Sequence, residues 1–284
     1  MSMYLYTQNV LAIFFSAAVV SSVCIGLNNS ALAAVVVNAT GTPYTQDFDG
    51  LISTGSGTFV DDSTINGWIV NSEEMDSNSD EYFANDGGST GGEVYSYGSD
   101  GSSDRALGYL GSGGNDYFNA VVVLENGTGT TINDVLISFV GEQWRSGGDS
   151  SDNQNVLTFA WQVGGSITVP ASTSLTGWTA VSALEFSAPQ PNVAAGALDG
   201  NDAANQTSFS GVSVTGLSWA DGQQLALRWV GNNGGGSDAG LAIDNVSVTA
   251  VPEPSTLALA GLGIAVAGLA ARRRRLASAT KAAA

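Results

Sequence analysis

The sequence predicts an all-β domain, folded as a two-sheet, jelly-roll-like sandwich, over residues 34–250. Short segments rich in β-branched and aromatic residues recur along this range, and many alternate apolar with polar side chains, the period of a half-buried strand. Turn-forming dipeptides such as Asn126-Gly127 and Asp221-Gly222 separate them. No segment of the range has a sustained helical period, so we expect about twelve strands and no helix.

The expected strands follow one another in short order, each ended by Gly, Asn, Asp or Ser. They are residues 35–37, 44–48, 68–70, 94–97, 106–110, 117–124, 135–144, 156–163, 179–186, 207–214, 224–230 and 241–248. Residues 71–92 are polar and glycine-rich with little periodicity, which predicts a long loop. The only clear domain boundary lies at residues 250–254, where two prolines follow the last strand.

The N-terminal residues are expected to direct export. Residues 10–27 are apolar or small, and Ala31-Leu32-Ala33 fits a signal-peptidase site. Residues 1–33 therefore predict a secretory signal peptide, handled by the Sec translocon and signal peptidase, although residues 1–9 hold no Lys or Arg. A retained N-terminal anchor is the alternative. The only cysteine, Cys24, would leave with this segment, so no disulfide is expected in the mature domain.

The C-terminal residues combine three parts in a fixed order. Pro252-Glu253-Pro254 interrupts regular structure, and residues 256–271 carry no charge and predict a short transmembrane helix that spans a bilayer core only marginally. A basic cluster follows, which should hold that end in the cytoplasm together with an extension over residues 276–284. The cluster is Arg272, Arg273, Arg274 and Arg275. An ordinary C-terminal membrane anchor is the alternative.

This tail resembles the PEP-CTERM sorting signal of bacterial envelope and secreted proteins. The matching residues are Pro252, Glu253 and Pro254, the glycines Gly261, Gly263 and Gly268, and the arginine cluster of residues 272–275. The resemblance implies recognition by an exosortase, a membrane-embedded cysteine transpeptidase-like enzyme, with cleavage near Pro-Glu-Pro. It implies a protein that crosses the inner membrane, is anchored there transiently, and reaches the cell surface or extracellular matrix.

Residues 44–248 resemble secreted bacterial β-sandwich domains that often carry such tails, in the segments 44–51, 63–68, 104–108, 141–145 and 242–246. This setting implies a non-enzymatic surface or matrix protein associated with extracellular polysaccharide or biofilm. The opening Asp-Phe-Asp of residues 47–49 and the closing Ile-Asp-Asn-Val of residues 243–246 also resemble jelly-roll carbohydrate-binding modules. The alternative function is therefore a lectin-like module with a calcium-supported ligand face.

Composition excludes several functions. Residues 34–250 carry 25 acidic and three basic residues, a formal net charge of −22, which repels nucleic-acid phosphates. The chain has no histidine and its only lysine is Lys281, so the common Ser/His/Asp, Cys/His and zinc arrangements are not possible in the domain. Paired carboxylates could cleave a glycoside, but Glu74-Met75-Asp76 is followed by Ser79 where a second Glu would be needed. We expect no enzyme.

Two groups of acidic residues are candidate calcium ligands. Asp47, Asp49 and Asp244 should lie close together if the first and last strands pair, and such like charges need a cation or an arginine nearby. Calcium is one solution; Arg105 or Arg228 as counterion is the other. Residues 76–80 alternate oxygen-bearing side chains as calcium loops do, but the turn glycine and the closing Glu are missing, so a solvated loop is expected.

The domain's three arginines and its larger aromatic residues have mainly structural interpretations. Arg145 and Arg228 each adjoin a tryptophan on an expected strand, which favours structural ion pairs over ligand contacts. A sugar-stacking platform would need exposed aromatic rings, whereas alternating strands need large core side chains. The candidates are Trp68, Trp161, Trp178, Trp219, Tyr95, Tyr97 and Tyr109.

Overall fold

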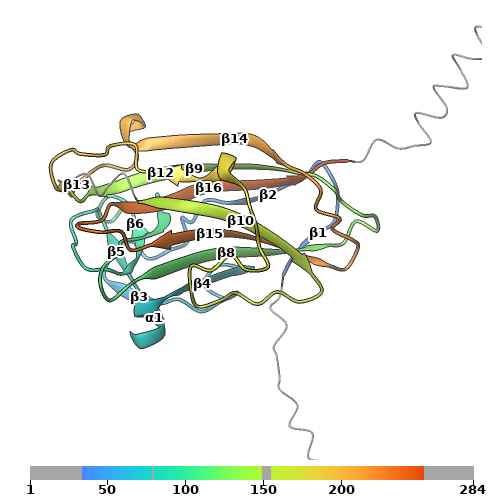
Figure 1. Cartoon of the computed structure of the whole chain (residues 1–284), viewed down its shortest axis with the longest axis horizontal. Coiled ribbons are helices and arrows are strands. Elements are labelled where there is room, and N and C mark those ends of the chain that lie inside the picture. The colour runs from blue at the N-terminus through green and yellow to red at the C-terminus, as the bar shows by residue number, and fades with distance from the viewer. Residues whose placement is uncertain (1–33, 79, 149–154, 253–284) are drawn as a thin grey trace, which may run out of the picture. The chain divides into compact units, whose positions relative to one another are not determined.

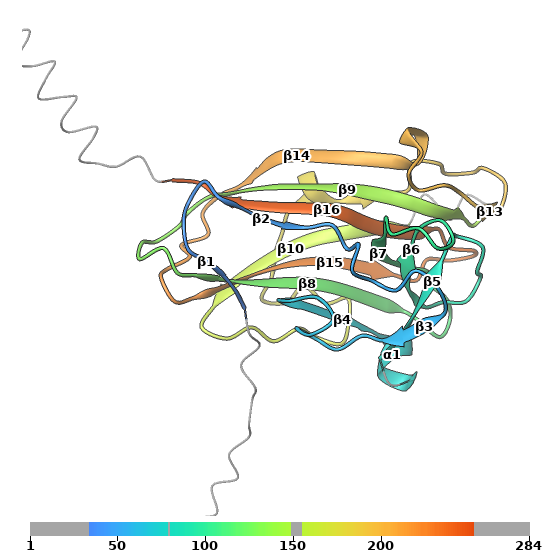
Figure 2. The ribbon, with the colours of Figure 1, turned by 180° about the vertical axis from the view of Figure 1, so that it is seen from behind.

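The computed structural model describes residues 34–78, 80–148 and 155–252, which form two β-sheets packed face to face (Figures 1 and 2). The expected two-sheet sandwich is therefore confirmed. The predicted signal peptide of residues 1–33, the predicted transmembrane helix of residues 256–271, Glu253, Pro254 and the arginine cluster lie outside the described residues. Within the described part of the chain, no helix has the length and apolar character needed to cross a membrane.

The seven-stranded sheet is centred on three long strands. Its order is β1 (Val35–Val37), β8 (Tyr117–Asn126), β15 (Gln224–Asn232), β10 (Val156–Gly164) and β11 (Thr179–Ala180), with β4 (Trp68–Ser72) on β8 and β12 (Phe186–Ser187) on β10. The three long strands pair antiparallel, whereas β1 joins β8 in parallel. Apolar residues point to both faces of this sheet, which indicates that both faces are covered.

The nine-stranded sheet contains the last strand of the domain. Its order is β13 (Gly196–Ala197), β9 (Val135–Ser146), β16 (Gly240–Ala250), β7 (Ala106–Tyr109), β6 (Val94–Tyr97), β5 (Glu81–Asn85) and β3 (Ser56–Thr58). Strand β14 (Gln206–Val214) also pairs with β9, and β2 (Pro43–Gln46) pairs with β16. The β2–β16 pairing, with Gln46 opposite Val246, meets the condition on which the proximity of Asp47, Asp49 and Asp244 depended, although the first strand, β1, lies in the other sheet.

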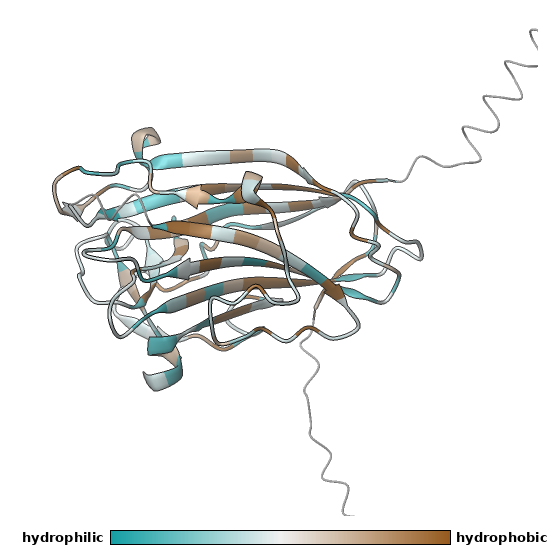
Figure 3. Ribbon diagram, viewed as in Figure 1, coloured by the Kyte–Doolittle hydropathy of each residue, from teal (hydrophilic) through white to brown (hydrophobic). Residues whose placement is uncertain are grey.

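Trp229 lies at the centre of the core between the sheets. Its ring stacks on Trp68 at 5.7 Å, and the rings of Phe139 and Phe159 meet it edge-on at 5.5 and 5.1 Å. Phe139 comes from the nine-stranded sheet and the other three from the seven-stranded sheet, so this cluster joins the layers. Figure 3 shows the apolar residues concentrated along the central strands. Replacing such a ring with alanine costs about 3–5 kcal/mol.

Two sequence expectations about secondary structure are wrong. Residues 71–92 are not one long loop: they contain the end of β4, helix α1 (Glu73–Asn78) and β5. Ser72 Oγ accepts the Met75 backbone N–H at 3.2 Å and caps the helix, while Met75 is buried in the core. Residues 179–186 are not one strand, because the 3₁₀ turn η2 (Ser182–Leu184) separates β11 from β12 and buries Leu184.

Candidate functional site

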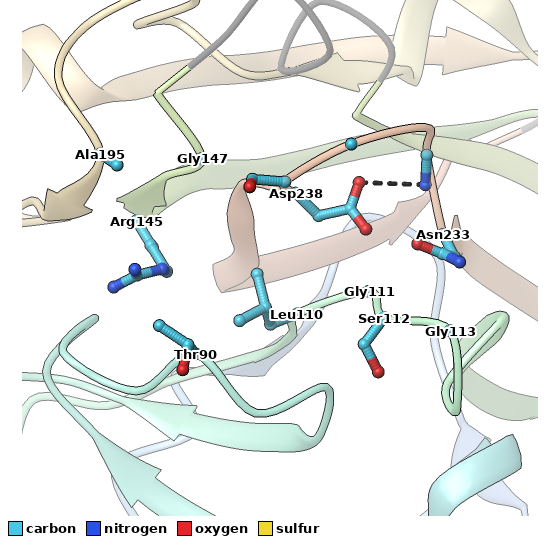
Figure 4. Close-up of a pocket in the computed structure, with 13 residues that line it drawn as sticks. Thr90, Leu110, Gly111, Ser112, Gly113, Arg145, Gly147, Ala195, Asn233 and Asp238 are labelled. Carbon is cyan, nitrogen blue, oxygen red and sulfur yellow. Dashed lines mark hydrogen bonds between the residues drawn. The ribbon is translucent and has the colours of Figure 1, made fainter.

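A polar cavity of about 440 Å³ lies where several loops meet at one end of the sandwich (Figure 4). Its walls come from the β7–β8 loop, the end of β9 and the β15–β16 loop, with Thr90 and Ala195 completing the rim. The lining is glycine-rich and includes no aromatic residue among the described positions. This size is typical of small-molecule pockets, and the exposed backbone offers both amide donors and carbonyl acceptors.

Arg145, near the end of β9, is the basic residue of this pocket. Its Nη1 donates to the carbonyl oxygens of Gly87 at 2.9 Å and Gly88 at 3.4 Å, which fixes the guanidinium. Gly240 lies opposite on β16, and a Cβ there would approach Tyr97 Oη to 2.5 Å and Arg145 Cβ to 3.1 Å. A glycine is therefore needed beside Arg145.

Asp238 supports the opposite wall. The residue is 6% exposed, and its Oδ1 accepts hydrogen bonds from Asn155 Nδ2 at 2.8 Å and from the Gly234 backbone N–H at 3.0 Å, the bond drawn in Figure 4. These contacts fix the β15–β16 loop. Burial, and then the charge of Asp238, raise the pKa of the Tyr109 hydroxyl. Tyr109 therefore stays neutral and donates to the Asn232 carbonyl at 2.9 Å.

A pair of buried carboxyl groups lies on the outer face of the nine-stranded sheet. Glu142 on β9 pairs in register with Ala242, and Asp244 is two residues further along β16, so the two acids are diagonal neighbours. They are 2% and 3% exposed. Glu142 accepts from Trp144 Nε1 at 2.8 Å and from Gln206 Nε2 at 3.2 Å. Asp244 Oδ2 accepts from Asn245 Nδ2 at 2.6 Å, whereas its buried Oδ1 has no partner.

Burial raises the pKa of both carboxyl groups, to about 8 for Glu142 and about 7 for Asp244. Neighbouring charges add to this: Asp244 and Asp104 raise the pKa of Glu142, and Asp104, Asp49 and Asp47 raise that of Asp244. Glycine at position 200 is required over this face, since a Cβ there would lie 2.3 Å from the Trp144 ring. Trp144, which donates to Glu142, therefore lies under the segment that leads to β14.

The charges of Asp47 and Asp49 act on Asp244, but the three predicted calcium ligands differ in exposure. Asp47 and Asp49 are exposed and Asp244 is buried, and Asp49 Oδ1 accepts the Arg105 backbone N–H at 3.2 Å. In the described ranges, no group of three or more acidic, cysteine or histidine residues is arranged to hold a metal ion. Calcium at these residues stays a prediction.

The second candidate calcium segment has a different structure from the loop expected. Residues 76–78 belong to helix α1, and the Asp76 carboxylate accepts a hydrogen bond from the Tyr117 hydroxyl. The alternating ligand geometry of a calcium loop is therefore not formed there.

The prediction that Arg228 is a counterion of the Asp47, Asp49 and Asp244 carboxylates is wrong. Arg105 does contact Asp49, but through its backbone N–H and not through its guanidinium. Arg228 lies on β15, in the other sheet from Asp244. The Arg105 guanidinium donates to Ser96 Oγ at 2.9 Å and to the carbonyls of Ser96 and Ser99. The described guanidinium hydrogen bonds of Arg105, Arg145 and Arg228 all go to uncharged oxygens, so such contacts replace the expected structural ion pairs among the described residues.

The candidate platform aromatics are mostly core residues. Trp68, Trp219, Tyr95, Tyr97 and Tyr109 are buried, and Trp161 and Trp178 are half-buried. Over the described ranges the exposed large hydrophobic side chains are Val36, Val60 and Leu136, none of them aromatic. The structural interpretation of these rings is therefore confirmed for the five buried ones.

Sequence reasoning missed the loop-end pocket and the role of Glu142. The pocket loops, around residues 111–114 and 232–236, look in sequence like ordinary glycine-rich connections, and their meeting depends on the pairing of β7, β9 and β16. Glu142 did carry a usable signal: it lies two residues before Trp144 on one strand, so the two side chains share a face. An acid beside a buried tryptophan predicts a buried carboxyl group.

Solved structures with a similar arrangement share little sequence with this chain. The K3 cleaved adhesin domain of Lys-gingipain from Porphyromonas gingivalis is 14% identical, with 64% of this chain and 91% of that chain covered and a TM-score of 0.35. The CBM22-1 xylan-binding domain of Paenibacillus barcinonensis Xyn10C is 11% identical, with 76% and 99% covered and a TM-score of 0.31. TM-scores of this size carry no conclusion about ligands.

No curated protein sequence matches the chain. A family model does match its end: residues 250–275 fit the PEP-CTERM protein-sorting motif, the region in which the sequence places Pro252-Glu253-Pro254, an apolar run and the arginine cluster. The chain is thus a two-sheet β-sandwich that carries a PEP-CTERM protein-sorting motif.

Proposed function

We propose that this chain is an exported, non-enzymatic surface or extracellular-matrix protein, sorted by an exosortase and associated with extracellular polysaccharide. The observation that carries the proposal is the sorting motif at residues 250–275. A motif of this kind implies export and recognition at the membrane. The strongly acidic domain before it would then be the part delivered outside, where its charge keeps it soluble.

The absence of catalysis is supported by the chemistry of the domain. It has no histidine and no lysine. Its two acids with strongly raised pKa values, Glu142 and Asp244, are the residues most like a general acid and base. However, both are almost fully buried, so a glycosidic bond could not reach between them.

A structural role is favoured over a sugar-stacking module by the burial of aromatic rings. A stacking module presents two or more aromatic rings on one face, because each ring covers one sugar face. In the described part of the chain the tryptophans are buried or half-buried. Trp178, a half-buried one, covers the Arg228 guanidinium, whose carbon lies 5.1 Å from its ring centroid.

The proposal is tested by replacing Pro252-Glu253-Pro254 with three alanines in the native host. We expect the variant to stay in the inner membrane at full length, while the wild type is found outside without its tail. Mass spectrometry of the exported wild-type protein gives the second readout. A C-terminal peptide reaching through Arg275 on the mature protein would contradict exosortase sorting. The association with polysaccharide is tested by digesting the extracellular polysaccharide with enzymes. We expect this digestion to release the wild-type protein from the matrix.

The rival function is a lectin-like carbohydrate-binding module. One observation favours it: the 440 Å³ polar cavity around Arg145, which needs no stacking platform to hold a ligand.

A further inference from the structure

We propose that the loop-end pocket binds a single neutral, hydroxyl-rich sugar unit, end-on, with Arg145 as its principal donor. This inference rests on the proposed association with polysaccharide and names the site and the ligand class for it. The pocket is a loop-built cavity rather than a platform on a sheet face, so it takes the end of a glycan rather than the middle of a chain.

Arg145 is the accessible cation of the domain. Of the three arginines in residues 34–250, Arg105 is 1% exposed and Arg228 is fully buried, whereas Arg145 is half-buried and lines the cavity. Its described hydrogen bonds use only Nη1, toward Gly87 and Gly88, and these bonds hold the planar group in one orientation. Its Nε and Nη2 donors can then meet a ligand without further ordering, which lowers the entropic cost of binding.

The pocket combines donors and acceptors without an excess of positive charge. Arg145, Ser112, Thr90 and backbone amides donate, while glycine carbonyls and the Asn233 amide oxygen accept. Every sugar hydroxyl can donate and accept at once, so a neutral sugar satisfies both kinds of group. An anionic ligand would face Asp238 across the pocket and the −22 charge of the domain.

Affinity is expected to be low. No described lining residue offers a ring face to stack on, and that contact contributes a large share of apolar burial in sugar sites. Binding then rests on a few hydrogen bonds to a charged donor, each contributing about 1.5–3 kcal/mol. Loss of the Arg145 guanidinium should therefore weaken binding about tenfold or more.

The test uses the full-length protein in a detergent without a sugar headgroup. Cellobiose, lactose, maltose and xylobiose are the neutral probes and glucuronic acid is the anionic one, each titrated by calorimetry and ligand-observed NMR. Arg145→Ala should weaken binding of the neutral probe at least tenfold. Gly113→Gln should abolish it by filling the cavity, because a Cβ at Gly113 meets no atom within 4 Å and the residue lines the pocket.

Gly165→Gln is the matched control. Gly165 is also a glycine with open space at its Cβ, but it lies in the β10–β11 segment, away from the pocket lining. The Gly165→Gln variant should bind the neutral probes with an affinity within twofold of the wild type. All three variants should have the melting temperature of the wild type. Equal binding by Arg145→Ala, tighter binding of glucuronic acid, or no binding of any neutral probe would each overturn the proposal. None of these results would change where the protein is sorted, so the two proposals fail separately.

Discussion

The outer faces of the two sheets each bury ionisable groups, and they compensate for this burial in opposite ways. On the seven-stranded sheet, the Arg228 guanidinium donates to Asn119 Oδ1 at 2.8 and 2.6 Å and to the carbonyls of Ser172 and Ser174 at 2.5 and 2.8 Å. On the nine-stranded sheet, Glu142 and Asp244 lie side by side with few donors around them.

The difference follows from the chemistry of the groups. Burial lowers the pKa of Arg228 only to about 10, so the guanidinium stays charged at neutral pH and the fold must supply acceptors for it. A carboxyl group can instead take up a proton and become neutral, which is what the raised pKa values of Glu142 and Asp244 describe. One face is therefore expected to be insensitive to pH near neutrality, and the other sensitive to it.

The largest effect is expected from removing the acceptor on the arginine face. Asn119→Leu leaves a fully buried guanidinium with two of its hydrogen bonds missing. A hydrogen bond to a charged group contributes about 1.5–3 kcal/mol, so the free energy of unfolding should fall by about 3 kcal/mol or more. Urea denaturation measures it. Gln223→Leu is the matched control, because it removes a side-chain amide at a half-buried loop position that, among the described residues, has no buried guanidinium to bond. A loss below about 1 kcal/mol for Asn119→Leu would mean that water reaches the guanidinium.

A pH dependence is expected from the acidic face. The folded pKa values of Glu142 and Asp244 lie above those of unfolded carboxyl groups, about 4, so the folded state binds more protons between pH 4 and 8. Stability from the pair is therefore present at low pH and lost as pH rises through 7–8. Where the folded state binds one more proton than the unfolded state, the free energy of unfolding falls by about 1.4 kcal/mol for each unit by which the pH rises.

Asp244→Asn should flatten that slope and raise stability at pH 8, because it removes one charge of the pair. Asp202→Asn, at an exposed acid on the neighbouring segment, should keep the wild-type slope. Denaturant midpoints of the wild type and both variants, measured from pH 5 to pH 8, give these slopes. A slope that persists in Asp244→Asn would assign the protons to other groups.

Calcium offers the acidic face a second way to neutralise its charge. Asp244 Oδ1 is buried without a partner, and the exposed Asp47 and Asp49 could turn toward a cation beside it. We therefore predict stabilisation of about 2.7 kcal/mol at a hundredfold excess of calcium over Kd. Because protons compete with calcium, the shift in melting temperature should be larger at pH 8 than at pH 5. Identical melting temperatures with calcium and with chelator would mean that the acidic face is neutralised by protonation and not by calcium.

The sequence predicted the strands of both sheets better than it predicted their outer faces. Alternation indicated β9 and β15 as strands. The proximity of Asp47 and Asp244 depended on pairing between strands near the two ends of the domain, and β2 and β16 do pair. The neighbours Arg228 and Trp229 point to opposite faces of β15, and both are fully buried. This follows from residues 165–178, which fold over the sheet and bring Ile167 and Trp178 against it, a long-range contact that no local pattern encodes.

Glycine-rich segments account for most of the remaining error. Residues 71–92 looked like a loop because their polar content hides the buried Met75 and Tyr82, which anchor α1 and β5 to the core. The pocket around Arg145 was not predictable, because its walls come from loops that are distant in sequence and meet only through the register of β9 and β16.

The smallest effect is expected from the aromatic ring of Trp178, considered apart from the hydrogen bonds of the Arg228 guanidinium. Trp178 covers the Arg228 guanidinium, whose carbon lies 5.1 Å from the ring centroid, and packs on the outer face with Ile167. Trp178→Leu keeps an apolar cover but removes the aromatic face that attracts the cation. A double-mutant cycle with Arg228→Met isolates the pairwise contribution, which we expect to be about 1 kcal/mol.

That coupling energy should be the same at pH 5 and at pH 8, because the guanidinium is charged at both. A coupling energy that changes with pH would show that Arg228 senses the ionisation of the other face, and the two faces could then no longer be treated as independent. A coupling of zero would mean that Trp178 serves only as apolar cover, in which case Leu and Trp at this position should give the same denaturant midpoint.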